Sequence, residues 1–193
     1  MAAACATCGL PLPLRRCPRS AGAWHVERVF APFEYGYPLD HYLQALKFSH
    51  GRLLGRALAL LTADALAPVL AAGALEADAL VPVPLHRERL LQRGYNQAVE
   101  IARTLAAELG WRLELSAAGR ARQEAAQSRL GARARRENVA HAFRVRRNFE
   151  GRRLTIVDDV ITTGATVNAL AAALREAGAE RVEAIAVART VPP

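Results

Sequence analysis

Residues 154–166 read Leu-Thr-Ile-Val-Asp-Asp-Val-Ile-Thr-Thr-Gly-Ala-Thr, and this stretch is the most informative part of the chain. Leu154–Val157 is a short apolar run rich in β-branched residues, which predicts a buried strand. Asp158 and Asp159 end the apolar run, and a small turn rich in hydroxyl groups follows. The apolar spacing beyond that turn predicts a helix over residues 166–177. The order is therefore a strand, an acidic pair, a turn and a helix start.

This arrangement predicts a site for a sugar phosphate. Backbone N–H groups in the first turn of a helix have no internal partner, and the helix dipole adds positive potential, so a phosphate binds well there. Gly164 lets the backbone approach a ligand closely, and the neighbouring threonines add hydroxyl donors. Because two carboxylates would repel a phosphate, we expect Asp158 and Asp159 to accept hydrogen bonds from ribose hydroxyls. The alternative is a buried strand that runs into an ordinary capped turn.

A second strand, loop and helix pattern occupies residues 81–97. Its strand is predicted at 79–83, and the loop that follows is basic. Arginine binds phosphate through a two-pronged guanidinium, so the loop predicts a pyrophosphate site facing the acidic pair. A solvated basic loop is the alternative. The arginines that we expect to bind pyrophosphate are Arg87, Arg89 and Arg93.

The remaining pattern predicts an α/β fold. Alternating strands and helices indicate a parallel sheet with helices on both faces, whose ligands bind at the carboxyl ends of the strands. Residues 28–37 predict a strand or a hairpin, and residues 116–138 predict a mobile loop that leads into a short helix. Further strands are predicted at 111–115, 142–145 and 182–188, and further helices at 42–48, 53–70 and 95–109.

Length and composition fit one α/β domain with a small appendage. The chain has 193 residues, of which 52% are hydrophobic. We place the appendage at residues 1–27 and the main domain at 28–193. No apolar run reaches transmembrane length, and the N-terminus lacks the pattern of a secretory signal. The expectation is therefore a cytoplasmic protein without membrane insertion.

The net charge of +8 is concentrated in one stretch. Residues 112–153 contain 12 arginines and 4 glutamates, whereas the rest of the chain is neutral. Such a basic stretch predicts a polyanionic partner, which could be pyrophosphate or nucleic acid. A basic loop that closes over pyrophosphate would screen its charge and exclude water. The alternative is a solvated charged helix.

The three cysteines all lie within the first 17 residues. Cys5 and Cys8 have the spacing of a half-site for structural zinc, because the turn between them brings both thiolates to one metal. Cys17 would add a third ligand, but Ser20 stands where a fourth cysteine would complete the site. His25 is the nearest replacement. A decayed zinc knuckle and a redox pair are the alternatives.

Residues 154–166 resemble the binding motif for 5-phosphoribosyl-1-pyrophosphate (PRPP) in type I phosphoribosyltransferases, and the match covers every position. The resemblance implies that Asp158 and Asp159 hold the 2′- and 3′-hydroxyls of the ribose and serve catalysis. It also implies that the 5′-phosphate is cradled by Thr162, Thr163, Gly164, Ala165 and Thr166.

Taken together, four segments resemble the ComF/GntX family of phosphoribosyltransferase-like proteins. They are the cysteine pair, Val-Pro-Val-Pro-Leu with Arg-Gly-Tyr-Asn-Gln at 81–97, Gln127 to Phe143, and residues 154–166. The family implies a type I phosphoribosyltransferase fold with a zinc-ribbon-like appendage at Cys5, Cys8 and Cys17, and a context of competence and DNA uptake.

The resemblance leaves two functions open. One is Mg²⁺-dependent phosphoribosyl transfer from PRPP to an acceptor that the sequence does not name. The other is a non-catalytic protein that binds nucleotide or single-stranded DNA and works with DNA-uptake proteins. The chain departs from the family pattern at the absent fourth cysteine and at residues 122–124, where the family tends to have a threonine. The sequence does not predict an oligomeric state.

Overall fold

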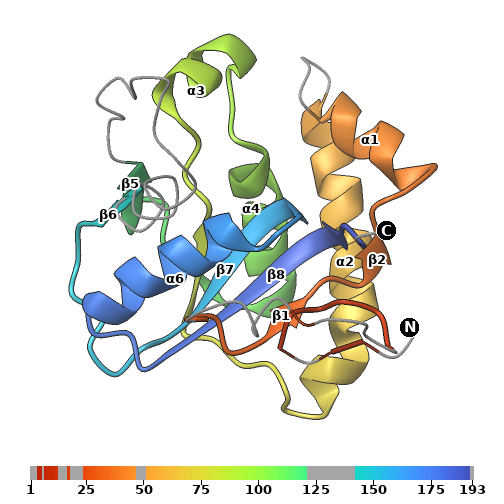
Figure 1. Ribbon diagram of the computed structural model, residues 1–193. Coiled ribbons are helices and arrows are strands. Elements are labelled where there is room, and N and C mark those ends of the chain that lie inside the picture. Colours follow the sequence, from red (N-terminus) through yellow and green to blue (C-terminus); the bar gives the residue numbers. More distant parts are fainter. Residues whose placement is uncertain are drawn as a thin grey trace.

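The computed structural model describes residues 4–5, 7–12, 17, 24–46, 51–120 and 142–191. Its centre is a parallel sheet with the strand order β1-β8-β7-β3-β4, and β2 also pairs with β8 (Figure 1). The parallel sheet confirms the predicted fold class. The strands are β1 (Val29–Phe30), β2 (Phe33–Glu34), β3 (Ala79–Pro82), β4 (Arg112–Leu113), β7 (Arg153–Ile161) and β8 (Arg181–Arg189).

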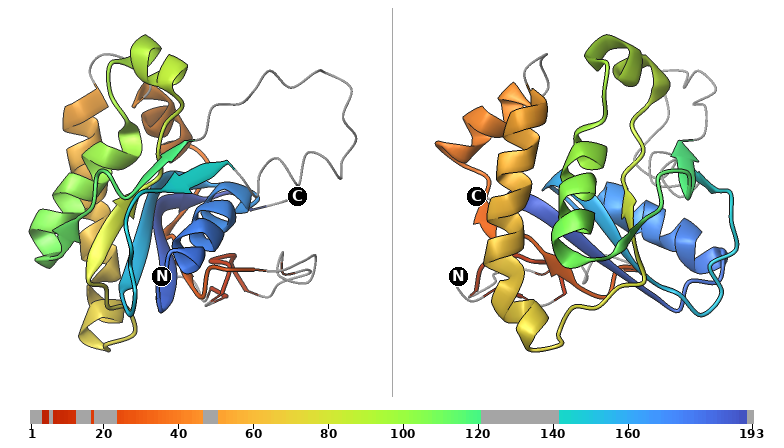
Figure 2. Two further views of the ribbon diagram at one scale, coloured as in Figure 1. Left: turned by 90° about the vertical axis from the view of Figure 1, so that its left-hand side faces the viewer. Right: turned by 180° about the vertical axis from the view of Figure 1, so that it is seen from behind.

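Helices cover both faces of this sheet, as Figure 2 shows edge-on. α2 and α4 lie on one face and α6 lies on the other. In the first part of β7, side chains alternate between the two resulting cores. Ile156 packs into the core under α6 with Leu170, and Val157 packs into the opposite core with Leu105. The helices are α1 (Leu39–Ala45), α2 (Gly51–Ala71), α3 (Arg87–Arg93), α4 (Gln97–Leu109) and α6 (Ala165–Glu176).

Two predicted segments differ from the structure because neighbouring strands decide their pairing. The prediction that the motif strand stops at residue 157 is wrong, since β7 continues through the acidic pair to Ile161. β8 runs alongside it as far as Arg189 and supplies backbone partners for those extra residues. The hairpin alternative for residues 28–37 is also wrong, because β1 and β2 both pair with β8 in parallel.

The stretch predicted as a mobile loop at 116–138 begins as a strand. β5 (Ala118–Arg120) pairs antiparallel with β6 (Phe143–Val145) in a small second sheet. The short helix predicted at the end of this stretch falls in 121–141, outside the described residues. The basic loop predicted after β3 is also more ordered than expected, because it contains α3.

α2 corrects the prediction that no apolar stretch reaches transmembrane length. This helix has 21 residues, and an 18-residue window within it is apolar enough by length and composition, because a helix tolerates the scattered Thr62 and Asp64 that interrupt the apolar run. The helix also has a side that packs in the protein. Leu58 and Leu66 are buried in the core that α2 shares with α4 and the sheet.

Candidate functional site

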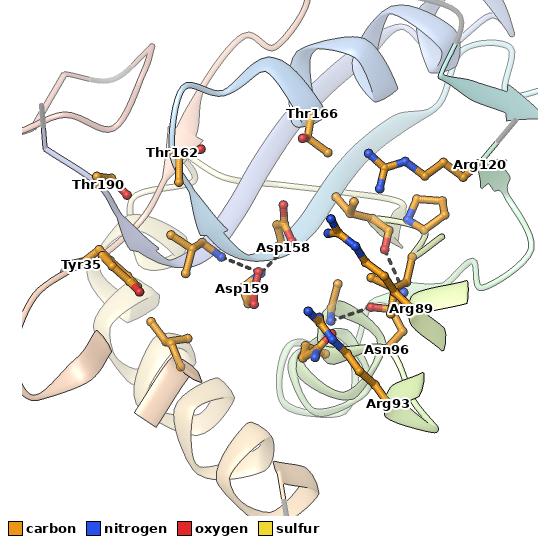
Figure 3. Close-up of a pocket in the computed structure, with 17 residues that line it drawn as sticks. Tyr35, Arg89, Arg93, Asn96, Arg120, Asp158, Asp159, Thr162, Thr166 and Thr190 are labelled. Atoms are coloured by element: carbon orange, nitrogen blue, oxygen red, sulfur yellow. Dashed lines mark hydrogen bonds between the residues drawn. The ribbon is translucent and has the colours of Figure 1, made fainter. Parts of the chain in front are cut away.

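A cavity of about 490 Å³ lies at the carboxyl ends of β3, β7 and β8, where a parallel sheet is expected to bind its ligands (Figure 3). Several elements and their adjoining loops contribute to its wall, so residues far apart in sequence meet there. The lining residues with polar side chains are Tyr35, Arg89, Arg93, Asn96, Gln97, Arg120, Asp158, Asp159, Thr162, Thr166 and Thr190.

The acidic pair lies in the middle of this wall, on the last part of β7. The backbone N–H of Asp159 donates to Oδ1 of Asp158 at 3.0 Å, and the N–H of Val160 donates to Oδ1 of Asp159 at 2.8 Å. Burial and the adjacent negative charge of Asp159 hold the pKa of Asp158 well above its ordinary value, although the positive charge of Arg120 opposes this. The strand therefore fixes two carboxylates that repel each other in the absence of a ligand.

The predicted phosphate turn follows directly. Thr162 and Thr166 line the cavity, whereas residues 163–165 are not among the lining residues. The hydroxyl of Thr163 instead accepts a hydrogen bond from the backbone N–H of Ala165 at 3.3 Å. The first and last residues of the turn, Thr162 and Thr166, therefore face the cavity, whereas residues 163–165 form the start of α6.

Gly164 serves the turn in a way that the sequence did not reveal. It ends the turn in the left-handed region, with φ of +82°, where a side chain would be strained. A Cβ at this position would lie only 2.4 Å from the ring of Trp24. The close neighbour of Gly164 in the protein is therefore an aromatic side chain from the N-terminal part of the chain. A tryptophan in a segment of low periodicity gives no sequence signal for this contact.

Arginines form one side of the cavity, next to the acidic pair (Figure 3). Arg89 and Arg93 are one helical turn apart on α3, and both line the cavity. Arg87 begins the same helix, is exposed and does not line it, so the structure separates Arg87 from the two arginines with which it was grouped. Asn96 anchors the end of this segment, because its Nδ2 donates to the carbonyl of Val83 at 2.9 Å.

Arg120 is a third cavity arginine, and the sequence did not single it out as a pyrophosphate ligand. Its guanidinium carbon lies 5.7 Å from the ring centroid of Phe143, which packs across from it on β6. Burial and the positive charge of Arg89 lower the pKa of Arg120, and the charge of Asp158 opposes this. Cations that destabilise one another in this way are suited to a polyanion that lies between them.

The described residues that line the other side of the acidic pair are uncharged. Tyr35, Leu43 and Val160 line it, together with Thr190 just beyond the end of β8. Figure 3 shows Tyr35 and Thr190 on one side of the acidic pair and the arginines on the other. The Thr190 hydroxyl oxygen is buried and has no hydrogen-bond partner in the described part of the chain. A position just after a parallel strand was the available sequence signal for Thr190.

The three cysteines lie together, as predicted. Their sulfur atoms are all within 4.8 Å of one another, which fits ligands that share one zinc ion at about 2.3 Å each. The backbone forms a turn in which the Gly9 N–H donates to the carbonyl of Cys5 at 2.8 Å. Burial raises the pKa of the Cys8 thiol to about 12. His25 is not in the group of metal-ligating side chains that the described residues form.

A family model for the phosphoribosyl transferase domain matches residues 90–190. This range includes the acidic pair, the phosphate turn and the cavity arginines Arg93 and Arg120. The chain belongs to the phosphoribosyl transferase domain family and, within it, to the ComF/GntX group that its motifs predicted.

The relatives agree with that placement. The chain is 35% identical over 193 residues to the DNA utilization protein YhgH of Escherichia coli (strain K12), an alignment that covers 97% of this chain and 84% of the relative. It is 32% identical over 177 residues to competence protein F of Haemophilus influenzae, with 90% of this chain and 76% of the relative covered.

Two solved structures are also similar. Glutamine PRPP amidotransferase from B. subtilis, complexed with ADP and GMP, matches 70% of this chain and 25% of its own, with a TM-score of 0.45 and 25% identity. A purine phosphoribosyltransferase from Pyrococcus horikoshii matches 84% of this chain and 88% of its own, with a TM-score of 0.37 and 15% identity.

Proposed function

We propose that the protein binds PRPP with Mg²⁺ and transfers the phosphoribosyl group to an acceptor. The observation that carries the proposal is the division of the described cavity lining into a side with arginines and a side with uncharged residues, with two carboxylates between them. A ribose held at the carboxylates would have its leaving group on one side and its acceptor on the other.

Each part of PRPP has a matching surface. The ribose hydroxyls would donate to Asp158 and Asp159, and the 5′-phosphate would lie at the turn between Thr162 and Thr166. The cavity arginines would bind the pyrophosphate in two-pronged contacts. Oxygen donors of the kind that Mg²⁺ prefers are present in the acidic pair and in pyrophosphate itself, and the ion would neutralise charge on the leaving group when bound.

The chemistry then follows from charge. The bond between ribose C1 and the pyrophosphate oxygen breaks, the electron pair leaves with the pyrophosphate, and C1 bonds to the acceptor. Fixed positive charge at the leaving group stabilises this step because it is in place before charge develops. The uncharged side offers Tyr35 as an aromatic surface and the Thr190 hydroxyl as a hydrogen-bonding group, which suits a planar, neutral acceptor.

Calorimetry with PRPP and Mg²⁺ tests the binding step. The wild-type protein should bind, and Asp158→Asn combined with Asp159→Asn should not. Asp64→Asn is the matched control, because Asp64 is an exposed carboxylate on α2. Failure of the wild type to bind would remove the proposal. Release of pyrophosphate with a panel of purine and pyrimidine bases then identifies the acceptor.

A second candidate is supported by the basic stretch and by the name of the Escherichia coli relative, a DNA utilization protein. In this alternative, the arginines of residues 112–153 would contact the backbone of single-stranded DNA. Part of that charge is already engaged, because Arg147 pairs with Glu114 and Arg153 pairs with Glu76. If DNA binds through several phosphates, its affinity should fall steeply with salt, with a log–log slope of about −0.7 per phosphate contact. A flat slope would exclude this function.

We also propose that the protein acts in the cytoplasm, either alone or with DNA-uptake proteins. A fusion to a reporter that is active only in the cytoplasm tests this location.

A further inference from the structure

The N-terminal segment contacts the phosphate turn from both of its ends. At the start of the turn, Arg189 is the connecting residue, and only 2% of it is exposed. Its Nε donates to the carbonyl of Cys8 at 2.9 Å, and its Nη1 donates to the carbonyl of Ile161 at 2.8 Å. One guanidinium therefore joins a cysteine of the cluster to the residue that precedes Thr162.

At the other end of the turn, two residues of the same N-terminal segment take part. The ring of Trp24 lies against Gly164, at the position where a Cβ would otherwise be. The backbone N–H of His25 donates to Oδ1 of Asn168, in the first turn of α6, at 2.5 Å. The turn is thus held before and after the residues that would meet a phosphate.

The electrostatics of Arg189 point to the cysteine cluster as its counter-charge. No ion pair in the described parts of the chain includes Arg189. A buried cation without an anion costs free energy, and backbone carbonyls offset this only in part. A divalent metal ion with three thiolate ligands has a net charge of −1. Such a metal site at the three cysteines would lie next to the guanidinium of Arg189.

We propose that metal binding at Cys5, Cys8 and Cys17 clamps the turn at residues 161–166 through Arg189, with Trp24 as the second contact. Any effect of the clamp on PRPP binding rests on the proposed function. The clamp itself is tested independently of that function, because metal affinity and backbone hydrogen exchange are measured without PRPP.

Metal titration of the full-length protein tests the role of Arg189. After removal of metal with a chelator, Zn²⁺ or Co²⁺ is titrated into the wild type, Arg189→Met and Arg189→Lys. Outer-shell partners of metal sites typically contribute about 10–100-fold to affinity, so Arg189→Met should lose about that much and Arg189→Lys less. Arg103→Met, a surface arginine on α4, is the control and should bind as the wild type does. Equal affinity in all four proteins, or no binding to the wild type, would overturn the proposal.

Hydrogen exchange tests the link to the turn. Metal should slow backbone exchange at residues 161–166 in the wild type and should not do so in Arg189→Met. If Arg189→Met does not fold, the clamp can still be tested in a protein that keeps Arg189, through the fluorescence of Trp24. The chain has two tryptophans, so Trp111→Phe leaves Trp24 as the only tryptophan, which is excited selectively over tyrosine. Its emission should change on metal loading. Unchanged emission together with unchanged exchange in the wild type would overturn the clamp, whatever the result with PRPP.

Discussion

Asp158 shows how a residue that we propose to bind ligand can reduce the stability of the unliganded fold. Its carboxyl group lies on a strand beside a second carboxyl group, and both line a cavity that is also lined by arginines. The raised pKa of Asp158 is the thermodynamic sign of that conflict. A ligand that supplies hydrogen-bond donors and a metal would relieve it.

The raised pKa predicts the direction of a pH effect on stability. Between the ordinary pKa of an aspartate and the raised one, the folded protein keeps a proton that the unfolded chain has lost, so stability is lost as pH rises through this range. Asp158→Asn removes this loss. We expect its melting temperature to match the wild type in acid and to exceed it near neutral pH. The gain in stability should be about 1.4 kcal/mol for each pH unit that separates the folded and unfolded pKa values.

Thermal melts across this pH range, without ligand or Mg²⁺, check the expectation. Asp64→Asn serves as the control and should run parallel to the wild type. If the Asp158→Asn and wild-type curves are parallel too, burial does not perturb this carboxyl group.

Gly164 gives a second prediction at this scale. Gly164→Ala places a Cβ in the left-handed region, which costs about 1–2 kcal/mol, and also forces Trp24 to move. Gly151→Ala is a matched control, because φ is +67° there and nothing lies within 4 Å of the added Cβ. Denaturant unfolding should therefore show a larger loss for Gly164→Ala, and Trp24→Leu should reduce the difference between the two. Equal losses would mean that the contact with Trp24 has no energetic weight.

At the scale of elements, α3 decides which arginines reach the cavity. The sequence analysis grouped Arg87, Arg89 and Arg93 because it predicted a loop, and in a loop any of the three side chains could point toward the ligand. In the helix, only one face points toward the cavity, and Arg89 and Arg93 lie one turn apart on that face. Gly94 ends the helix in the left-handed region, with φ of +75°.

This placement predicts that three substitutions on α3 will differ in their effect on the affinity for PRPP or pyrophosphate. Arg89→Gln and Arg93→Gln should each weaken the binding of PRPP or pyrophosphate by roughly 10–100-fold, since a hydrogen bond to a charged group is worth about 1.5–3 kcal/mol. Arg87→Gln should leave the affinity nearly unchanged. Calorimetry with pyrophosphate and Mg²⁺ measures all three, and an equal loss in Arg87→Gln would show that α3 turns when a ligand binds.

For the whole molecule, ligand binding should appear as stability. A ligand present at about 100 times its Kd and bound only to the folded state adds about 2.7 kcal/mol. For a chain of this size, that corresponds to a rise in melting temperature on the order of 5–10 °C. The rise should require PRPP and Mg²⁺ together and should vanish in the double aspartate variant. A rise with Mg²⁺ alone would place the ion on the protein rather than on pyrophosphate.

The sheet and the motif around Asp158 could be predicted because both depend on residues that are close together in the sequence. The sequence could not predict contacts that the chain makes only after folding. Thr190 reaches the cavity and Trp24 reaches Gly164 from separate segments, and neither stands out in its own stretch of sequence. Arg120 lies in the basic stretch that the sequence did single out, but its position in the cavity depends on the pairing of β5 with β6. The end of β7 was misjudged for a related reason, since the continuation of a strand depends on the neighbour that pairs with it.

The acidic pair lies where the regular alternation of side chains along β7 ends. Ile156 lies in the core under α6 and Val157 in the opposite core, but Val160 packs against that same opposite core and Ile161 lies under α6. The order of faces is therefore reversed between residues 157 and 160, and Asp158 and Asp159 are the two residues in between. The positive charge of Arg120 acts on Asp158. The two carboxylates are thus unlike positions on the strand rather than a duplicated group, and substituting them one at a time would separate their roles.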